Sequence, residues 1–316
     1  MEPVINLPLT SRPDRGAVTL TTCDERLGAD DHAGSRTATR VGRDAAPPDA
    51  APPRGAARSL RPRRVIPPLW REYRAAGILL SMLRDERCDA QPRPIDGAPV
   101  LLVPGVFAGD ASLAPLAATL RDHGWAVWPA GIRNNVGCSG AIVQGLLTGL
   151  EEIAAARGTR VAIVGHSRGG LLARAAAQRR PDLVSGVVTL GSPHRDQLAV
   201  HPLLWANVVA LATLGSLGVS GLMRFGCRGT RDCCRGFDHD VAAPLPADIG
   251  AVSLFSRRDG VVDWRACIDP DASNIEVTAT HCGMPSDPAT MRVILGALAD
   301  FQSSPHVEPV ALPMAA

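Results

Sequence analysis

The residues best suited to chemistry lie in the stretch GHSRG at 165–169, where a serine stands between two glycines. The apolar run VAIV before it predicts a buried strand, and the GLL after it opens a predicted helix. The glycines remove side chains where a sharp strand-to-helix turn is crowded, so Ser167 can be held in a strained conformation with its hydroxyl above the sheet. The pattern predicts a serine nucleophile, and the alternative is a serine in an ordinary glycine-rich turn.

A serine nucleophile needs a base, usually a histidine whose tautomer is fixed by a carboxylate. In the order serine, acid, histidine that accompanies this turn, His281 is the predicted base, because it follows a predicted strand and precedes the last predicted helix. The other histidines after the serine fit that position less well; they are His194, His201, His239 and His306.

The predicted acid is Asp259, at the carboxyl end of the strand predicted at 251–255. Asp263, in the same loop, is the alternative acid. The aspartate that is not used would be a solvated or loop-capping residue. Asp269 precedes a proline and is expected in a turn.

Acyl transfer also needs N–H donors for the oxyanion. One predicted donor is the backbone N–H of Arg168, directly after the nucleophile. The second is expected in the loop after the first buried strand. Pro104, at the start of that loop, has no N–H and cannot be the donor. Phe107 and Leu171, just past the elbow, are expected to line an apolar substrate pocket.

The elements that must position these residues alternate between strands and helices. Short apolar runs predict strands at 100–103, 126–128, 160–164, 187–190, 251–255 and 275–278. Helical spacing and helix-stop residues predict helices at 112–123, 139–157, 170–180 and 288–301. This alternation is typical of a doubly wound, mostly parallel α/β sheet, in which ligands bind at the carboxyl ends of the strands.

The chain divides into segments of different composition. The Pro/Ala/Arg-rich stretch 1–64 predicts a disordered tail, and 305–316 a polar C-terminal tail. Residues 65–94 are predicted as an amphipathic helix and linker, whose apolar stripe either docks on the globular domain or makes peripheral contact with a membrane. The globular domain is predicted at 95–304. Its apolar insertion at about 195–247 is expected to form a helical cap over the site, rather than a membrane span or plain core helices.

Composition narrows the function classes. The 316 residues are 46% apolar with a formal charge of +2, which allows a sizeable core and excludes collagen-like, coiled-coil and wholly disordered proteins. The near-neutral charge gives no electrostatic case for a nucleic-acid partner. The absence of lysine excludes lysine-dependent chemistry. No secretory signal is recognisable, so a cytoplasmic location and reduced thiols are expected.

The eight cysteines predict no metal site. The spacing of Cys227, Cys233 and Cys234 matches no standard zinc motif, and adjacent cysteines are poorly placed to bind one ion. A disulfide from Cys227 to either of them, or one between Cys267 and Cys282, stays open as an alternative to free thiols. No phosphate-binding loop or dinucleotide fingerprint occurs, so no cofactor is expected.

Five stretches resemble the α/β-hydrolase superfamily, and within it the lipases and esterases: VLLVPGVFAG, VAIVGHSRGG, VVTLGSPH, SRRDGVVD and THCGM, over roughly residues 98–302. The resemblance implies a serine hydrolase of lipid metabolism that cleaves small-molecule or lipid carboxylic esters with apolar acyl chains through an acyl-enzyme. In similar lipases the second oxyanion donor follows a His-Gly pair, so the resemblance implies Val106 as that donor, with Phe107 as the alternative register. The chain departs from these lipases at Pro104, where they carry histidine. Alternatives are an acyl-thioesterase, an acyltransferase, or a non-catalytic domain that binds a lipid or a partner. The sequence indicates no oligomeric state.

Overall fold

The computed structural model describes residues 66–72, 97–227, 234 and 236–303. The predicted tails at 1–64 and 305–316, and most of the predicted helix and linker at 65–94, lie outside the described residues. The part of that helix that is described, Leu69–Glu72, is a 3-10 helix (η1). Leu69 packs against the buried cluster that contains Phe255 and Val262, so this short helix lies against the globular domain.

Six parallel strands form one sheet in the order β2-β1-β3-β4-β5-β6. The strands are β1 (Pro99–Val103), β2 (Ala126–Pro129), β3 (Val161–His166), β4 (Val184–Leu190), β5 (Gly250–Phe255) and β6 (Ser273–Glu276). The chain goes outward from β1 to β2 and then returns to the other side of β1 with β3. The topological switch point, where such sheets bind ligands, therefore lies between the carboxyl ends of β1 and β3.

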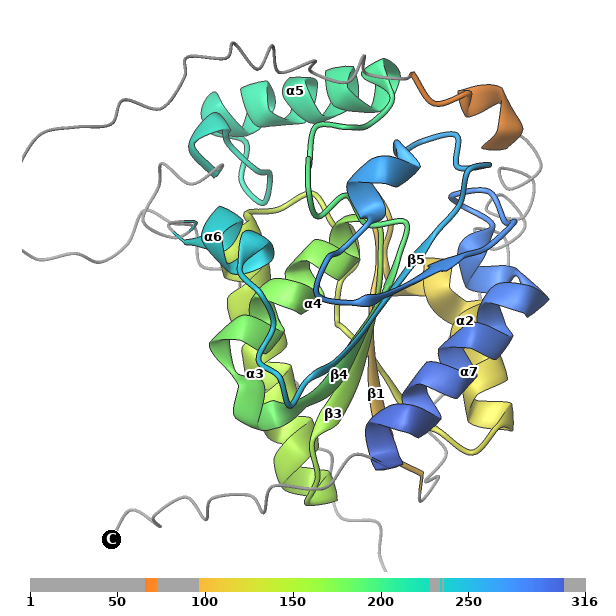
Figure 1. Ribbon diagram of the computed structural model, residues 1–316. Coiled ribbons are helices and arrows are strands. Elements are labelled where there is room, and N and C mark those ends of the chain that lie inside the picture. Colours follow the sequence, from red (N-terminus) through yellow and green to blue (C-terminus); the bar gives the residue numbers. More distant parts are fainter. Residues whose placement is uncertain (1–65, 73–96, 228–233, 235, 304–316) are drawn as a thin grey trace, which may run out of the picture.

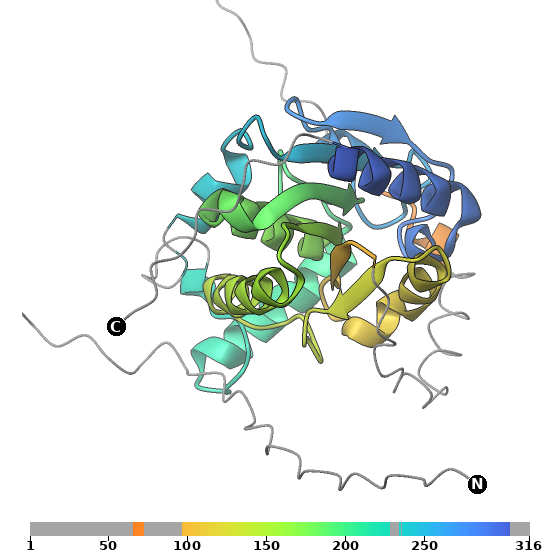
Figure 2. The same cartoon turned by 90° about the horizontal axis from the view of Figure 1, so that it is seen from below.

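Helices cover both faces of the sheet (Figures 1 and 2). One face carries α2 (Ala114–Asp122) and α7 (Pro288–Ser303), and the other carries α3 (Ser139–Arg157) and α4 (Arg168–Arg179). Side chains of a strand alternate between the two faces, so Val100 and Leu102 join the core under α2 and α7, while Leu101 and Val103 join the core under α3 and α4. Burial on both faces explains why this strand is a continuous apolar run.

The α/β sheet is confirmed, and the element boundaries differ from the prediction by a few residues. Helix α3 has the predicted bounds, because Gly158 ends it with a φ of 65° and donates its N–H to Ala154. Strand β4 begins earlier than predicted, because its pairing with β3 extends to Val184. Strand β6 lies at 273–276 instead of 275–278. It is a largely exposed edge strand, so no apolar run marks its position.

The insertion between β4 and β5 contains α5 (Pro202–Ser216) and α6 (Phe237–Ala242), and α5 crosses above the carboxyl ends of the strands (Figure 1). Its sequence has no charged residue, yet only Ala212 and Gly215 are buried. Leu203, Trp205 and Leu214 are among its exposed large apolar side chains. None of the described helices is long and apolar enough to cross a membrane.

The segment that leads into α5 is hydrogen-bonded to the loop after β5. The N–H of His201 donates to the carbonyl of Val261 at 2.7 Å, and the N–H of Asp263 donates to Ala199 at 2.8 Å. Val200 and Val262 form an antiparallel bridge between them. Residues 195–201 are therefore fixed to the loop that carries the predicted acid.

Candidate active site

Ser167 occupies a sharp turn between β3 and α4, with φ 53° and ψ −120°. Backbone in this region costs about 1–3 kcal/mol and persists only where the surroundings enforce it. A side chain at Gly165 would collide with the first turn of α4, and one at Gly169 would collide with the carbonyl of Val103. The N–H of Ser167 donates to Leu190 at 2.8 Å. The glycines of the motif are thus required by close backbone approach, and the strand-to-helix context predicted for Ser167 is present.

His281 and Asp259 form a buried pair, with 2.6 Å between Nδ1 and Oδ2. The other oxygen of Asp259 accepts the N–H groups of Val261 at 2.8 Å and Val262 at 2.7 Å. The Nδ1 proton of His281 is donated to Asp259, which leaves Nε2 to exchange a proton. Burial lowers the pKa of His281. The charge and hydrogen bond of Asp259, with the charge of Glu72, outweigh burial and leave that pKa above its usual value.

The ends of β3 and β4 bring the serine turn against this pair. Gly191 directly follows Leu190, which accepts the Ser167 N–H; a Cβ on Gly191 would lie 2.9 Å from His281 Nδ1. His166 Nε2 donates to the carbonyl of His281 at 3.0 Å, and the two rings are 4.8 Å apart. Burial and the neighbouring His281 lower the pKa of His166 to about 3, so it acts as a neutral donor.

The other candidate acids have structural partners. Asp263, the alternative acid, accepts the N–H of Arg265 at 3.1 Å and caps the short helix η7 (Trp264–Cys267). Asp269 forms a buried ion pair with Arg174. Of the three aspartates, Asp259 is the one paired with His281.

Three of the four other candidate histidines lie in the described residues, and their surroundings differ. His194 is buried and its Nε2 is 3.0 Å from the hydroxyl of Thr189. His201 caps α5, because its Nδ1 accepts the N–H of Leu203 at 3.1 Å. The side chain of His239 is 84% exposed. His306 lies outside the described residues.

Glu72 is a buried carboxylate that the sequence analysis missed. Its Oε1 accepts the N–H of Gly260 and the N–H of His281, both at 2.9 Å, and its Oε2 accepts the N–H of Cys282 at 3.0 Å. A single side chain from η1 therefore joins the loop after Asp259 to the loop that carries the histidine. No local motif marks Glu72, because its partners lie 188–210 residues away.

The two predicted oxyanion donors, Val106 and Arg168, line the same cavity as Ser167. Buried Asn135, also missed from sequence, fixes both loops. Its Nδ2 donates to the carbonyl of Pro104 at 2.7 Å, its Oδ1 accepts from Arg168 Nη1 at 2.7 Å, and its backbone bridges to Val106. Burial lowers the pKa of the Arg168 guanidinium to about 10, which leaves it charged at neutral pH.

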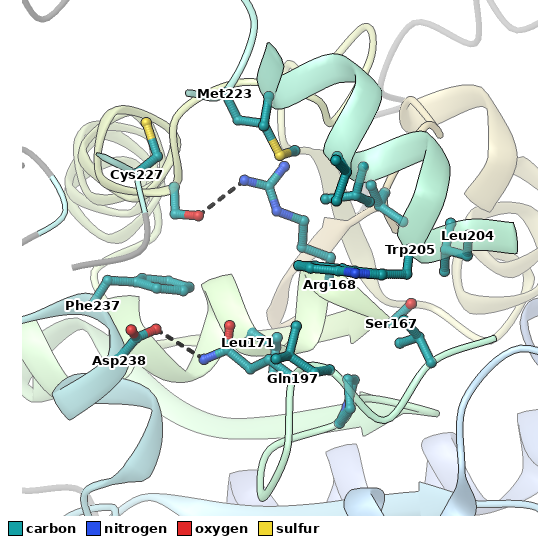
Figure 3. A pocket seen from close by; sticks show the side chains of 18 of the residues that line it. Ser167, Arg168, Leu171, Gln197, Leu204, Trp205, Met223, Cys227, Phe237 and Asp238 are labelled. Carbon is teal, nitrogen blue, oxygen red and sulfur yellow. Dashed lines mark hydrogen bonds between the residues drawn. The ribbon is translucent and has the colours of Figure 1, made fainter. Parts of the chain in front are cut away.

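An apolar cavity of about 150 Å³ extends from Ser167 beneath α5 (Figure 3). Leu171, a predicted pocket residue, is one of the residues that line it. Trp205 lies toward the Ser167 end and Phe237 toward the far end. Phe107 is not among the described residues that line this cavity; it has a φ of 63° and is 40% exposed.

The cysteines are arranged differently from the sequence alternatives. Cys267 is buried and Cys282 exposed, and both are free, so no disulfide joins them. Cys227 is not disulfide-bonded to Cys234, and Cys233 lies outside the described residues. The sulfurs of Cys227 and Cys234 instead gather with that of Cys138, from a distant part of the chain.

Comparisons with known proteins agree with this geometry. A family model described as alpha/beta hydrolase fold matches residues 153–220, which include the serine turn. Two triacylglycerol lipases, from Pseudarthrobacter phenanthrenivorans and Burkholderia plantarii, are each 38% identical over 107 residues, or 31% of this chain and 33% and 30% of theirs. The match thus spans about a third of the length of these relatives. The mature lipase BlEst2 of Bacillus licheniformis has a similar fold, with a TM-score of 0.50 and 18% identity over 66% of this chain and 94% of that chain. From its sheet and these matches, the chain has the α/β-hydrolase fold and is similar to lipases and esterases.

Proposed function

We propose that the protein is a serine hydrolase that cleaves carboxylic esters with apolar acyl groups. The observation that carries the proposal is the buried, hydrogen-bonded pair of Asp259 and His281, beside the turn that carries a strained Ser167 at the switch point of the sheet. Strained backbone and a raised histidine pKa are typical of catalytic sites. The two triacylglycerol lipases that match this chain act on esters by their names, which supports the same bond type here.

In the proposed mechanism, Ser167 Oγ attacks the ester carbonyl carbon while His281 Nε2 accepts the hydroxyl proton. Asp259 stabilises the resulting imidazolium through Nδ1. The N–H groups of Val106 and Arg168 donate to the oxyanion of the tetrahedral intermediate. His281 then gives its proton to the leaving alcohol, which leaves an acyl-enzyme. Water attacks that ester by the same route, returns the proton to Ser167 and releases the carboxylic acid.

The cavity supports an apolar acyl group. Its walls are mainly aliphatic and aromatic, and include Leu171, Leu204, Val208 and Val209. Helix α5 forms its cover and exposes Leu203, Trp205 and Leu214 on an uncharged surface. Exposed apolar patches of this kind mark contact with apolar partners, and here the patch lies on the helix that also lines the cavity. A lipid ester therefore fits the site better than a charged, water-soluble one.

Covalent labelling tests the proposal. A fluorophosphonate probe should add once to the intact protein. Ser167→Ala should abolish the adduct, whereas Ser303→Ala, at the exposed end of α7, should retain it. With p-nitrophenyl esters, Ser167→Ala should lower kcat by roughly 10⁴-fold or more while leaving the fold intact. A panel of acyl chain lengths, and the matching acyl-thioesters, would then define the substrate. Folded protein that takes no adduct and hydrolyses no ester would contradict the proposal and favour a non-catalytic binding domain.

A further inference from the structure

A cluster of three thiols lies beside the proposed esterase site, at the N-terminus of α3. The sulfurs of Cys138, Cys227 and Cys234 all lie within 4.8 Å of one another, and those of Cys138 and Cys234 are 3.2 Å apart. Cys138 caps α3, whereas Cys227 and Cys234 belong to the insertion between β4 and β5. The cluster therefore joins the insertion to the body of the domain.

The spacing of the sulfurs is close to that of a tetrahedral metal–thiolate site. A zinc–sulfur bond of about 2.3 Å places two ligand sulfurs about 3.8 Å apart. The separation of Cys138 and Cys234, 3.2 Å, and the outer limit of 4.8 Å for all pairs lie on either side of that value. A disulfide, in contrast, needs a separation of about 2.05 Å and would leave one of the three sulfurs without a role.

The charges around the cluster also fit a metal. The guanidinium of Arg168 is half-buried and donates to neutral acceptors: the carbonyl of Gly137 at 2.8 Å, the hydroxyl of Ser139 at 3.0 Å, and the carbonyl and amide oxygens of Asn135. Gly137 and Ser139 flank Cys138, and all three thiols interact electrostatically with this cation. Three thiolates and one divalent ion carry a net charge of −1, which Arg168 balances.

The N-terminus of α3 adds further support for negative charge on the sulfurs. Cys138 is the N-cap residue of this helix, and the N–H of Gly140 in its first turn donates to the sulfur of Cys234. The positive end of a helix dipole stabilises thiolates. The Arg168 guanidinium and the N-terminus of α3 thus both interact with this cluster of sulfurs.

We propose that Cys138, Cys227 and Cys234 bind a zinc ion. Thiolates are soft ligands that select zinc among the abundant divalent cations. On binding, the three thiols lose three protons to solvent and form three sulfur–zinc bonds, and water takes the fourth tetrahedral position. Cys227 also lines the cavity, so the ion would fix one wall of the substrate site. Cys138 lies too far along the chain for a sequence motif to include it.

The zinc content of the purified protein tests this proposal directly. The full-length protein, dialysed against metal-free buffer, should retain roughly one zinc per chain by inductively coupled plasma mass spectrometry. Cys138→Ser, Cys227→Ser and Cys234→Ser should each reduce this to a small fraction, whereas Cys282→Ser, at an exposed cysteine, should retain it. Because this readout is independent of ester hydrolysis, its failure would leave the proposed function untouched.

Cobalt binding provides a second readout if the serine variants fail to fold. Protein stripped of metal and reduced should take up one Co²⁺ per chain and develop a sulfur-to-cobalt charge-transfer band, and zinc should displace it. The proposal is overturned if reduced protein binds neither ion, or if zinc persists in a variant that lacks all three cysteines. It is also overturned if intact mass under non-reducing conditions is lower by two hydrogens and reduction restores no metal binding, since that result would identify a disulfide.

Discussion

Replacing Glu72 by glutamine tests how the histidine loop is held. The carboxylate accepts three backbone N–H groups from Gly260, His281 and Cys282, at 2.9–3.0 Å. A glutamine oxygen can keep the two N–H groups now bonded to Oε1, but its NH₂ would face the N–H of Cys282, donor against donor. One charge-assisted hydrogen bond is lost, so we expect the free energy of unfolding to fall by about 2–3 kcal/mol.

The same variant should change the pH dependence of the reaction. The negative charge of Glu72 raises the pKa of His281, so removing it should lower that pKa. The base must be neutral to accept a proton, and activity is therefore lost as pH falls through the His281 pKa. The wild-type acidic limb should have its midpoint above 6.5, and Glu72→Gln should move it to lower pH while reducing kcat.

Urea denaturation followed by tryptophan fluorescence gives the stability, and pH profiles of kcat/KM with a short-chain p-nitrophenyl ester give the titration. Glu152→Gln, the same substitution on the exposed face of α3, is the matched control, with an expected change in stability below about 0.5 kcal/mol. The reasoning is refuted if Glu72→Gln is as stable as this control and its acidic limb coincides with that of the wild type. A stability loss with an unmoved limb would show that the carboxylate only supports the loops.

Three further substitutions test other parts of the site. Asp259→Asn should lower the pKa of His281 and reduce kcat by roughly 10⁴-fold with little change in KM, as measured by the pH profile and steady-state kinetics. Gly191→Ala should lower kcat/KM at least about tenfold, because its Cβ would lie 2.9 Å from His281 Nδ1 at a φ of +59°. Gly145→Ala in α3, which has open space around it, should instead raise the free energy of unfolding measured in urea by about 0.5–1 kcal/mol. Asn135→Ala should lower kcat more than it changes KM, because the substitution releases both oxyanion loops. A variant whose kcat equals that of the wild type would argue against that role.

Much of the fold was accessible from the sequence because its signals are local. Strand β1 is buried on both faces and shows as an apolar run, and α3 ends at a glycine in the left-handed conformation. The turn at Ser167 depends on glycines within a few residues of it, and the order of acid and histidine follows from the succession of strands. Edge strand β6 was misplaced because half-exposed residues carry no apolar pattern.

The parts that the sequence did not reveal depend on contacts between distant residues. Glu72 resembles any charged residue on an amphipathic helix until the fold places it 2.9 Å from the N–H of His281. Asn135 lies in a polar loop, and its role arises from bonds to Pro104 and Arg168 about thirty residues away on either side. The spacing of residues along the chain predicts individual helices and strands well, but it does not predict which loops contact one another above the sheet.

The hydrogen bonds between residues 195–201 and the loop 261–266 determine where the proposed cap could be exchanged by protein engineering. Where the corresponding segment of a relative is grafted onto this scaffold, the upstream junction belongs after His201. Residues 195–201 are hydrogen-bonded to the loop that carries Asp259 and should be kept. A junction nearer the end of β4 would exchange those anchoring residues together with α5. The chimaera would then lose turnover for every substrate, and a misplaced acid loop would be mistaken for an incompatible cap.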